Sequence, residues 1–242
     1  MTERPSFPVQ FPAQVAAGYS TRFSSDASKP AAYRPAAVAT AIQSHGMDSA
    51  AIRLNMVKKL AALGLTDPLV LQAMGSVERH RFVDSALINQ AYEDTSLPIG
   101  LGQTISKPGV VGRMLALLRQ NAPVGSPIGA PIGAPGGAPT GVPGKLGRVL
   151  EIGTGCGYQA ALLSHLSTEV YSIERLRGLH DKARENLRHL RLANVHLLLG
   201  DGMAGFPKGA PYAAIIAAAG GETLPQAWID QLAVGGDRKS VV

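Results

Sequence analysis

The strand, glycine loop and helix around Gly153, Gly155 and Gly157 constrain the fold most strongly. Apolar residues from Val149 onward lead into glycines at alternate positions, and a helix-favouring segment, AALLSHL, follows shortly after Tyr158. Because glycine has no Cβ, such a loop lets backbone N–H groups and a helix N-terminus approach a ligand closely. The pattern therefore predicts a nucleotide-type site at the end of a strand.

From Gly147 onward, segments typical of strands alternate with segments typical of helices. The strand-like segments are GRVLEI, EVYSI, VHLLL and YAAII. Strands separated by helices of this length favour a parallel sheet with helices on both faces. Ligands of such sheets bind beyond the carboxyl ends of the strands. We therefore predict an α/β, Rossmann-like fold with a mostly parallel sheet.

The domain organisation is predicted from shifts in composition. Residues 1–48 are rich in Pro, Ala and Ser without sustained periodicity and are expected to be a disordered extension. One domain is then expected over residues 49–242, made of a helical part with a substrate loop (49–120), a Pro/Gly-rich insert (121–146) and a ligand-binding sheet (147–242). Prolines recur every fourth residue in the insert, which excludes collagen and predicts an extended tether.

Two helices and a long loop are expected before the insert. The first helix is predicted to bury one face, formed by Ile52, Met56, Leu60 and Leu63. The second is expected to have Asp67 as its N-cap and Pro68 at its first position. Residues 77–108 contain many glycines, prolines and hydroxyl groups, so we predict an ordered loop, where functional sites tend to lie.

The basic charge does not by itself identify a partner. The formal net charge is +6 and the sequence pI is about 9.6, which raises the question of nucleic-acid binding. Much of the basic excess lies on the predicted helix 175–194, and no aromatic residues are interleaved with a basic stretch as in single-strand binders. We expect a solvated amphipathic helix and no nucleic-acid partner.

The cysteine content and the hydropathy argue against disulfide, zinc-binding, membrane-spanning and secreted proteins. The single cysteine, Cys156, excludes an internal disulfide and a multi-cysteine zinc site, and no metal is expected. No apolar run approaches the roughly 20 residues of a membrane span. The N-terminus lacks the apolar segment of a secretory signal. We therefore expect a cytoplasmic protein without a membrane partner.

The spacing of the glycine loop favours S-adenosylmethionine over a dinucleotide. Dinucleotide sites use GxGxxG, whose third glycine allows close packing of helix and strand. Here GxGxG is followed by Tyr158 and Gln159, so the third glycine is not matched. Glu151 precedes the loop, where it would repel a pyrophosphate but suits the cationic sulfonium and amino groups of S-adenosylmethionine.

Two further strand ends carry carboxylates. Glu174 can accept hydrogen bonds from ribose hydroxyls, or it is a surface carboxylate paired with Arg175 or Arg177. Asp201 and Gly202 are placed to meet the adenine ring, or they form a plain Asp-Gly turn. The expected cofactor-binding residues are Glu151, Gly153, Thr154, Gly155, Gly157, Glu174, Asp201 and Gly202.

These motifs together resemble the protein-L-isoaspartate O-methyltransferase family. The matching strings are ExGxGxGYQAA, VYSIER, GDG and APYxAII, with YED, LPIGxGQTIS and RHxFV before the insert. The similarity covers roughly residues 50–120 and 146–236, and LPIGxGQTIS is the part that generic class I methyltransferases lack. The resemblance implies a class I methyltransferase fold. It also implies transfer of a methyl group from S-adenosylmethionine to the free α-carboxylate of L-isoaspartyl residues in damaged proteins, which initiates their repair.

The chemistry implied by the resemblance needs no strong base. A carboxylate is ionised at neutral pH, so catalysis depends on in-line positioning and on desolvation of the acceptor. The family's active-site serine corresponds to Ser106, with Thr104 beside it. The alternative is that both hydroxyls cap the helix beginning at Pro108. His80 is expected to be structural. Isoaspartyl proteins and peptides are the implied partners, and a monomer is expected.

Departures from the family pattern limit these expectations. The family usually has aspartate where this chain has Ala213, and an aromatic residue or histidine at Gly109. The polar DRKS after Gly236 is not typical of a central strand, so the C-terminal strands of the family fold are expected to be missing. Two alternatives stay open: a truncated S-adenosylmethionine-binding protein with little or no catalysis, and a basic nucleic-acid methyltransferase. The second is disfavoured because 217–221 lacks polar side chains.

Overall fold

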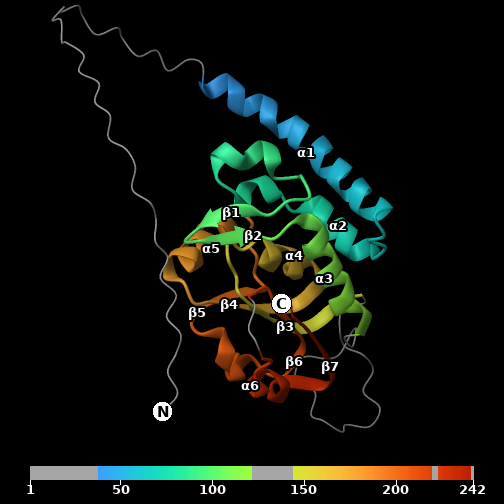
Figure 1. Cartoon of the computed structure of the whole chain (residues 1–242), viewed down its shortest axis with the longest axis vertical. Coiled ribbons are helices and arrows are strands. Elements are labelled where there is room, and N and C mark those ends of the chain that lie inside the picture. Colours follow the sequence, from blue (N-terminus) through green and yellow to red (C-terminus); the bar gives the residue numbers. More distant parts are fainter. Residues whose placement is uncertain (1–37, 122–143, 220–222, 241–242) are drawn as a thin grey trace, which may run out of the picture. The chain divides into compact units, whose positions relative to one another are not determined.

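A parallel sheet forms the centre of the computed structural model, which describes residues 38–121, 144–219 and 223–240. Its strands are β3 (Leu146–Ile152), β4 (Ser167–Glu174), β5 (Val195–Leu199), β6 (Tyr212–Ala217) and β7 (Leu232–Ser240). Within the described residues the sheet has the order β5-β4-β3-β6-β7, and all four neighbouring pairs are parallel (Figure 1). The predicted α/β fold with a mostly parallel sheet is confirmed.

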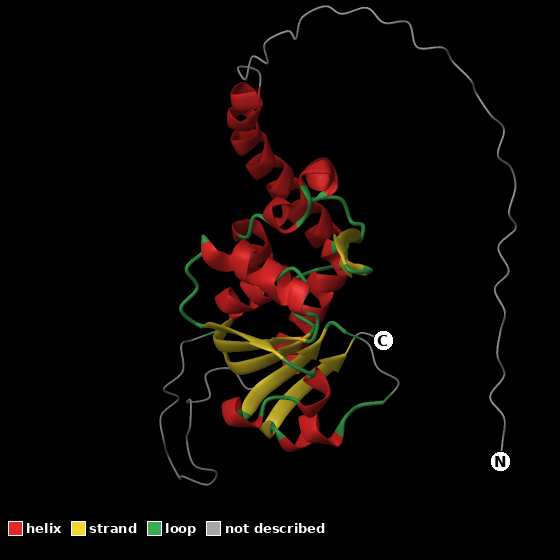
Figure 2. Ribbon diagram, turned by 90° about the vertical axis from the view of Figure 1, so that its left-hand side faces the viewer, coloured by secondary structure: helices red, strands yellow, loops and turns green. Residues whose placement is uncertain are grey.

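Helices cover both faces of this sheet, as predicted (Figure 2). The α-helices are α1 (Val38–Ala62), α2 (Pro68–Ser76), α3 (Pro108–Asn121), α4 (Tyr158–Leu166), α5 (Arg177–Arg188) and α6 (Gln226–Asp230). Short 3-10 helices are η1 (Arg79–Phe82), η2 (Ser85–Gln90), η3 (Gly202–Ala204) and η4 (Pro207–Gly209). None of the helices in these described ranges is long and apolar enough to cross a membrane.

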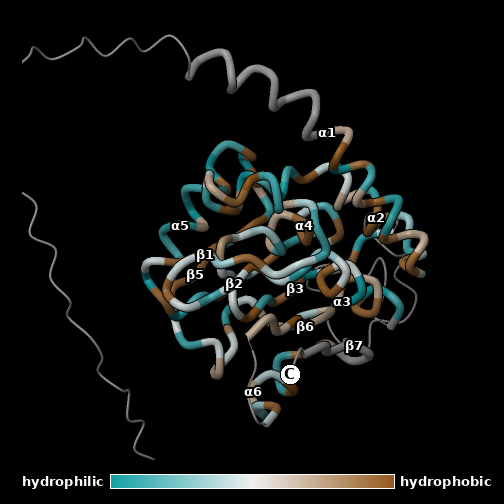
Figure 3. Tube along the Cα trace, turned by 45° about the horizontal axis from the view of Figure 1, so that its top comes forward, coloured by the Kyte–Doolittle hydropathy of each residue, from teal (hydrophilic) through white to brown (hydrophobic). Residues whose placement is uncertain are grey.

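The central strand β3 is buried on both sides. Val149 packs in a cluster that includes Leu162 of α4, whereas its neighbour Leu150 packs with Ile215 and Trp228 on the other side. Successive side chains of a strand point to opposite faces, so both faces of a covered parallel strand must be apolar. Hydrophobic residues accordingly gather around the central strands, with hydrophilic ones toward the outer turns (Figure 3).

The start of the ordered chain differs from the prediction. Helix α1 begins at Val38, within the segment expected to be disordered. Residues 1–37 and most of the Pro/Gly-rich insert (122–143) lie outside the described residues, so the predicted domain boundaries there stay predictions.

The buried face of α1 also differs from the prediction. Met56 and Leu60 are buried as expected, but Ile52 and Leu63 are 51% and 71% exposed. The buried stripe begins instead at the partly buried Arg53, whose Nε donates a hydrogen bond to the carbonyl oxygen of Gly75 at 2.8 Å. A long side chain can bury its methylene groups while its polar head is satisfied, and the apolar pattern alone did not reveal this.

Residues 77–108 contain more regular structure than the predicted loop. Besides η1 and η2 they form an antiparallel hairpin of β1 (Leu97–Gly100) and β2 (Gln103–Ile105). Leu97 and Ile99 of β1 and Ile105 of β2 have buried side chains. Leu101 lies in the turn with a positive φ of 52°. Strands this short contain too few residues for the alternation of apolar and polar side chains to be recognised in the sequence.

The polar C-terminal segment belongs to a strand, although its composition is not typical of a central strand. β7 lies beside β6 in parallel, with Ala214 opposite Asp237 and Ala217 opposite Ser240. It is an edge strand of the described sheet, with a neighbour on one side only. Charged residues are common on edge strands, where they oppose further strand pairing, so the polar composition argued against a central strand and not against an edge strand.

The predicted cap of α2 is confirmed and connects two helices. Asp67 Oδ1 accepts hydrogen bonds from the backbone N–H groups of Leu69 at 2.9 Å and Val70 at 3.1 Å, and Pro68 is the first helical residue. The other carboxylate oxygen accepts a hydrogen bond from Arg119 Nε of α3 at 2.8 Å. One side chain therefore caps α2 and ties it to α3.

We predict that Asp67→Ala lowers the free energy of unfolding by about 1–3 kcal/mol, because it removes both the cap and a largely buried ion-pair partner. Asp67→Asn keeps a capping oxygen and should cost less. Urea denaturation of both variants measures the two effects. Glu185→Ala, at an exposed pair with Arg188, is the control and should change the value by less than about 0.5 kcal/mol. Equal losses in Asp67→Ala and Glu185→Ala would contradict the assignment.

Candidate active site

A cavity of about 390 Å³ opens at the carboxyl ends of the central strands. This volume lies within the range of roughly 300–1,000 Å³ that is usual for small-molecule sites. One wall comes from the glycine loop after β3 and from the residues that follow β4, β5 and β6, and the other from the segment around β2. The cavity thus lies where open α/β sheets bind their ligands.

Most of the residues expected at the site do line this cavity. They are Thr104, Ser106, Gly153, Thr154, Gly155, Glu174, Asp201 and Gly202. Two of the expected residues, Glu151 and Gly157, are not part of its wall. Residues separated by about a hundred positions in the sequence therefore meet in one cavity. Glu151, just before the glycine loop, and Gly157, at its end, have other roles.

Gly157 supports packing and does not line the cavity. Its φ of +90° favours glycine, and a Cβ there would lie 3.1 Å from Leu187 Cδ1 on α5. Gly153 also has a φ of +90°, and its Cβ would lie 3.0 Å from the Cβ of Ala219. The expectation that all three loop glycines face the ligand is therefore corrected for Gly157, which lets α4 begin close to α5.

Glu151 lies behind the cavity wall. Its side chain is fully buried, and Ser172 Oγ donates a hydrogen bond to its Oε2. Ser172 Oγ is also 2.6 Å from Thr154 Oγ1, which belongs to a residue of the cavity wall. Burial raises the pKa of Glu151 to about 8, so its carboxyl group is mostly neutral at pH 7. The expectation that Glu151 meets a cationic ligand directly is not met; it supports the loop through Ser172.

Glu174 is held at the end of β4 by the backbone. Its Oε2 accepts a hydrogen bond from Gly155 N–H and its Oε1 one from Leu176 N–H, both at 2.9 Å. The residue is 5% exposed and lines the cavity. No ion pair joins it to Arg175 or Arg177 in the described part of the chain, so the alternative of a surface ion pair is wrong. A carboxylate fixed in this way keeps lone pairs for hydroxyl donors of a ligand.

Asp201 and Gly202 combine a turn with a place in the cavity wall. Asp201 Oδ1 accepts a hydrogen bond from Met203 N–H at 3.0 Å and caps η3. A Cβ on Gly202 would lie 2.5 Å from Ile152 Cγ2, so a larger residue cannot fit without a shift. The carbonyl oxygen of Gly202 accepts a hydrogen bond from Trp228 Nε1 at 2.8 Å. The turn and ligand-facing interpretations of this pair are therefore compatible.

The hydroxyls of Thr104 and Ser106 are not used to cap α3. The capping bond comes from Asp94, whose Oδ1 accepts a hydrogen bond from Gly109 N–H at 2.6 Å. A Cβ on Gly109 would lie 2.9 Å from this oxygen, which fits the glycine found there. Among the residues that the structure describes, neither hydroxyl has a hydrogen-bond partner. Both line the cavity and are available to a ligand.

Two further titratable groups of the cavity wall, the Cys156 thiol and the Tyr158 hydroxyl, are protonated near neutral pH. Burial raises the pKa of the Cys156 thiol to about 11 and that of the Tyr158 hydroxyl to about 12. His80, expected to be structural, is not part of the wall, and its Nδ1 lies 2.7 Å from the Tyr92 hydroxyl. Ala213, where the family usually has aspartate, lies outside the wall. The ionisable residues that line the cavity in the described ranges are Cys156, Tyr158, Glu174, Arg175 and Asp201.

No group of three or more His, Cys, Asp and Glu residues within the described ranges is arranged to hold a metal ion.

Two basic residues that hold the wall around β1 and β2 were not identified from the sequence. Arg79 Nη2 donates a hydrogen bond to the carbonyl oxygen of Ser106 at 2.9 Å. Lys182 Nζ of α5 donates to the carbonyl oxygen of Ile99 in β1 at 2.9 Å and pairs with Asp84 at 3.0 Å. Arg79 lies in the RHxFV string that contributed to the family resemblance, but nothing in the string shows that this arginine is buried.

We predict that Glu151→Gln changes how stability depends on pH. In the folded protein the Glu151 carboxyl stays protonated up to about pH 8, whereas in the unfolded chain it ionises near its ordinary pKa of 4.5. The wild type therefore loses stability as pH rises between these two values, and the glutamine variant lacks this loss. Relative to wild type, the variant should gain at least about 1 kcal/mol between about pH 5 and about pH 8.

Urea denaturation at both pH values measures this gain. Glu185→Gln, at an exposed site, is the surface control. A difference of the same size in the control would show that the pH dependence does not come from Glu151.

A family model and known proteins match this chain over most of its length. The model of the family described as protein-L-isoaspartate(D-aspartate) O-methyltransferase matches residues 52–128 and 144–238. A protein-L-isoaspartate O-methyltransferase of Leptothrix cholodnii is 57% identical over 203 residues, which cover 84% of this chain and 64% of that protein. The corresponding protein of Methylibium petroleiphilum is 54% identical, with 79% and 64% covered. The chain thus spans slightly less than two thirds of the length of these relatives.

Solved structures show the same fold. A protein-L-isoaspartate O-methyltransferase superposes with a TM-score of 0.61 at 27% identity, covering 76% of this chain and 53% of that one. A Plasmodium falciparum structure, titled a putative protein-L-isoaspartate O-methyltransferase in complex with S-adenosyl-L-homocysteine, has a TM-score of 0.58 at 21% identity. It covers 75% of this chain and 79% of that one, and at this identity it supports the fold alone. Because the family model matches residues on both sides of the Pro/Gly-rich insert, the chain belongs to the protein-L-isoaspartate(D-aspartate) O-methyltransferase family.

Proposed function

We propose that this chain transfers the methyl group of S-adenosylmethionine to the free α-carboxylate of L-isoaspartyl residues in damaged proteins and peptides, which initiates their repair. One observation supports the proposal most directly. A single cavity brings Glu174 and the glycine loop together with the hydroxyls of Thr104 and Ser106. We place the activity in the domain over residues 49–242. The monomeric state, the cytoplasmic location and the lack of a nucleic-acid partner stay predictions from the sequence.

The donor side of the cavity has the chemistry that S-adenosylmethionine requires. When bound, this cofactor supplies a methyl group on a cationic sulfonium. Gly153 and Gly155 lack the Cβ atoms that would crowd a ligand, and Glu174 offers a fixed carboxylate to its ribose hydroxyls. Ile152 and Met203 give the same wall an apolar surface suited to an adenine ring. The residues present therefore fit the cofactor.

The acceptor side has hydroxyl donors and no base. An isoaspartyl α-carboxylate is ionised at neutral pH. The Ser106 hydroxyl is proposed to donate a hydrogen bond to one of its oxygens and leave the other free to attack, with Thr104 as a second donor. Ile105 and Val111 line the cavity beside them and help to exclude water. Fixed donors in a site with little water orient the acceptor and raise its reactivity.

Two measurements on the 242-residue chain test the proposal. Calorimetry with S-adenosylhomocysteine should give saturable binding, and radiolabelled methyl transfer should occur to an isoaspartyl peptide. The same peptide with a normal aspartate is the matched control and should accept no methyl group. Binding without transfer would leave a cofactor-binding protein and contradict the enzyme. Equal labelling of both peptides would contradict the substrate, and absence of binding would contradict the cofactor.

We predict that Ser106→Ala lowers kcat for the isoaspartyl peptide by about 10–100-fold, because a fixed donor to the reacting group is lost. The dissociation constant for S-adenosylhomocysteine should change by less than about threefold, an energy change of under about 0.7 kcal/mol. Ser76→Ala removes a hydroxyl that donates to the Gln72 carbonyl oxygen on the exposed side of α2, and this control should leave both quantities unchanged. A full rate in Ser106→Ala would exclude the proposed role.

A further inference from the structure

Arg79 is a buried cation whose role the proposed reaction does not explain. Its side chain is fully buried in η1. No carboxylate forms an ion pair with it among the residues that the structure describes. Burial lowers the pKa of Arg79, although arginine remains protonated in proteins. Placing an unpaired guanidinium in a protein interior is costly, so the groups around it must offset that cost.

Three separate segments supply these groups. Arg79 Nε donates a hydrogen bond to the carbonyl oxygen of Ala91 at 2.8 Å, and Nη2 donates one to the carbonyl oxygen of Ser106 at 2.9 Å. The Cζ atom lies 4.8 Å from the ring centroid of Tyr158, a cation–π distance. The planar guanidinium thus joins the end of η2, the loop that carries Ser106 and the first turn of α4.

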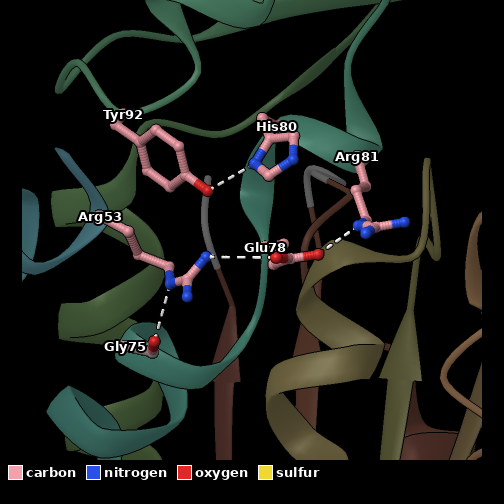
Figure 4. Close-up of polar contacts among 6 residues, drawn as sticks. All are labelled: Arg53, Gly75, Glu78, His80, Arg81 and Tyr92. Carbon is pink, nitrogen blue, oxygen red and sulfur yellow. Dashed lines mark hydrogen bonds and ion pairs between the residues drawn. The ribbon is translucent and has the colours of Figure 1, made fainter. Parts of the chain in front are cut away.

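The neighbouring basic residues of η1, His80 and Arg81, have other partners than Arg79 has (Figure 4). Arg81 pairs with Glu78 on a more exposed surface, and His80 meets the Tyr92 hydroxyl through Nδ1 at 2.7 Å. Arg81 therefore has the same side chain as Arg79 two positions along the chain, without the buried contacts. It provides a matched control.

Arg79 does not line the cavity, but it contacts residues on both of its sides. Ser106 lines the acceptor side, and Tyr158 lines the donor side directly after the glycine loop. A hydrogen bond to the Ser106 carbonyl fixes the backbone of the residue whose hydroxyl is free to meet the acceptor. The ring contact relates this backbone to the start of α4. Arginine suits this task because its rigid fork donates in two fixed directions, which lysine cannot do.

We propose that Arg79 is a positioning residue that holds Ser106 in register with the donor-binding loop. It does not touch the reactants. Its effect passes through the Ser106 backbone, and its contribution is to the alignment of acceptor and donor. This inference rests on the proposed methyl transfer. Its structural part, the anchoring of residues 103–107, can be measured without turnover.

Kinetics of Arg79→Met, Arg79→Lys and Arg81→Met test the effect on the reaction. Arg79→Met should lower kcat for the isoaspartyl peptide by about 10–100-fold, as expected for a small misplacement of reacting groups. S-adenosylhomocysteine should bind within about threefold of the wild-type affinity. Arg79→Lys keeps the charge without the fork and should recover part of the rate. Arg81→Met should match the wild type. A wild-type rate in Arg79→Met would overturn the proposal.

A double-mutant cycle tests whether the effect passes through Ser106. In the Ser106→Ala background, Arg79→Met should cause less than about a threefold further loss, because residues that act as one unit are not additive. A full 10–100-fold loss in that background would show that Arg79 acts on something other than Ser106 and would overturn the inference.

Hydrogen exchange gives a readout that does not require turnover. With S-adenosylhomocysteine present, Arg79→Met should speed amide exchange at residues 103–107 and leave β3 and β4 as in Arg81→Met. If Arg79→Met does not fold, Arg79→Lys is compared in the same way. Uniformly faster exchange would indicate a general structural role and overturn the proposal, as would unchanged exchange at 103–107. If the wild type methylates no isoaspartyl peptide, the proposed function fails while this measurement still decides the role of Arg79.

Discussion

The hydrogen bond between the Glu174 carboxylate and Gly155 N–H is the contact on which the site depends. It ties the glycine loop after β3 to the end of the neighbouring strand β4. The loop can take this path because Gly153, Gly155 and Gly157 all have positive φ, a conformation that side chains with a Cβ disfavour. The second oxygen of Glu174 holds Leu176 N–H before α5. One carboxylate therefore sets the relative positions of the loop and the chain entering α5.

The opposite wall is assembled from outside the sheet. Lys182 of α5 holds the β1 carbonyl of Ile99, Asp94 caps α3, and Arg79 holds the carbonyl of Ser106. Each of these side chains bonds to backbone, so the wall is fixed without using the hydroxyl of Ser106. Functional groups held by neighbouring contacts are positioned more accurately than groups on an unsupported loop. The wall around Ser106 is thus held in place by residues that do not line the cavity.

Local patterns predicted what depends on local chemistry. The Asp67 cap follows from a carboxylate before Pro68, and the place of Glu174 follows from a strand end in a parallel sheet. Contacts with residues distant in the sequence determined where the other side chains lie. Gly157 contacts α5, and Glu151 accepts a hydrogen bond from Ser172. In α1, Arg53 takes the place of Ile52 in the buried stripe. In each case the sequence contains the residue but not the partner that determines its direction, and a buried arginine such as Arg79 has no signature in a linear pattern.

The charges close to the glycine loop bear on the proposed anionic acceptor. Glu151 and Glu174 both carry carboxyl groups close to the glycine loop, and the charge of Glu174 adds to the effect of burial on the pKa of Glu151. With a pKa of about 8, Glu151 is mostly neutral at pH 7, while the charge of Glu174 is met by two backbone N–H groups. Glu174 and Asp201 line the cavity together with Arg175. An ionised Glu151 behind the wall would add a further negative charge and increase the repulsion of the proposed carboxylate acceptor, and burial of Glu151 removes that charge.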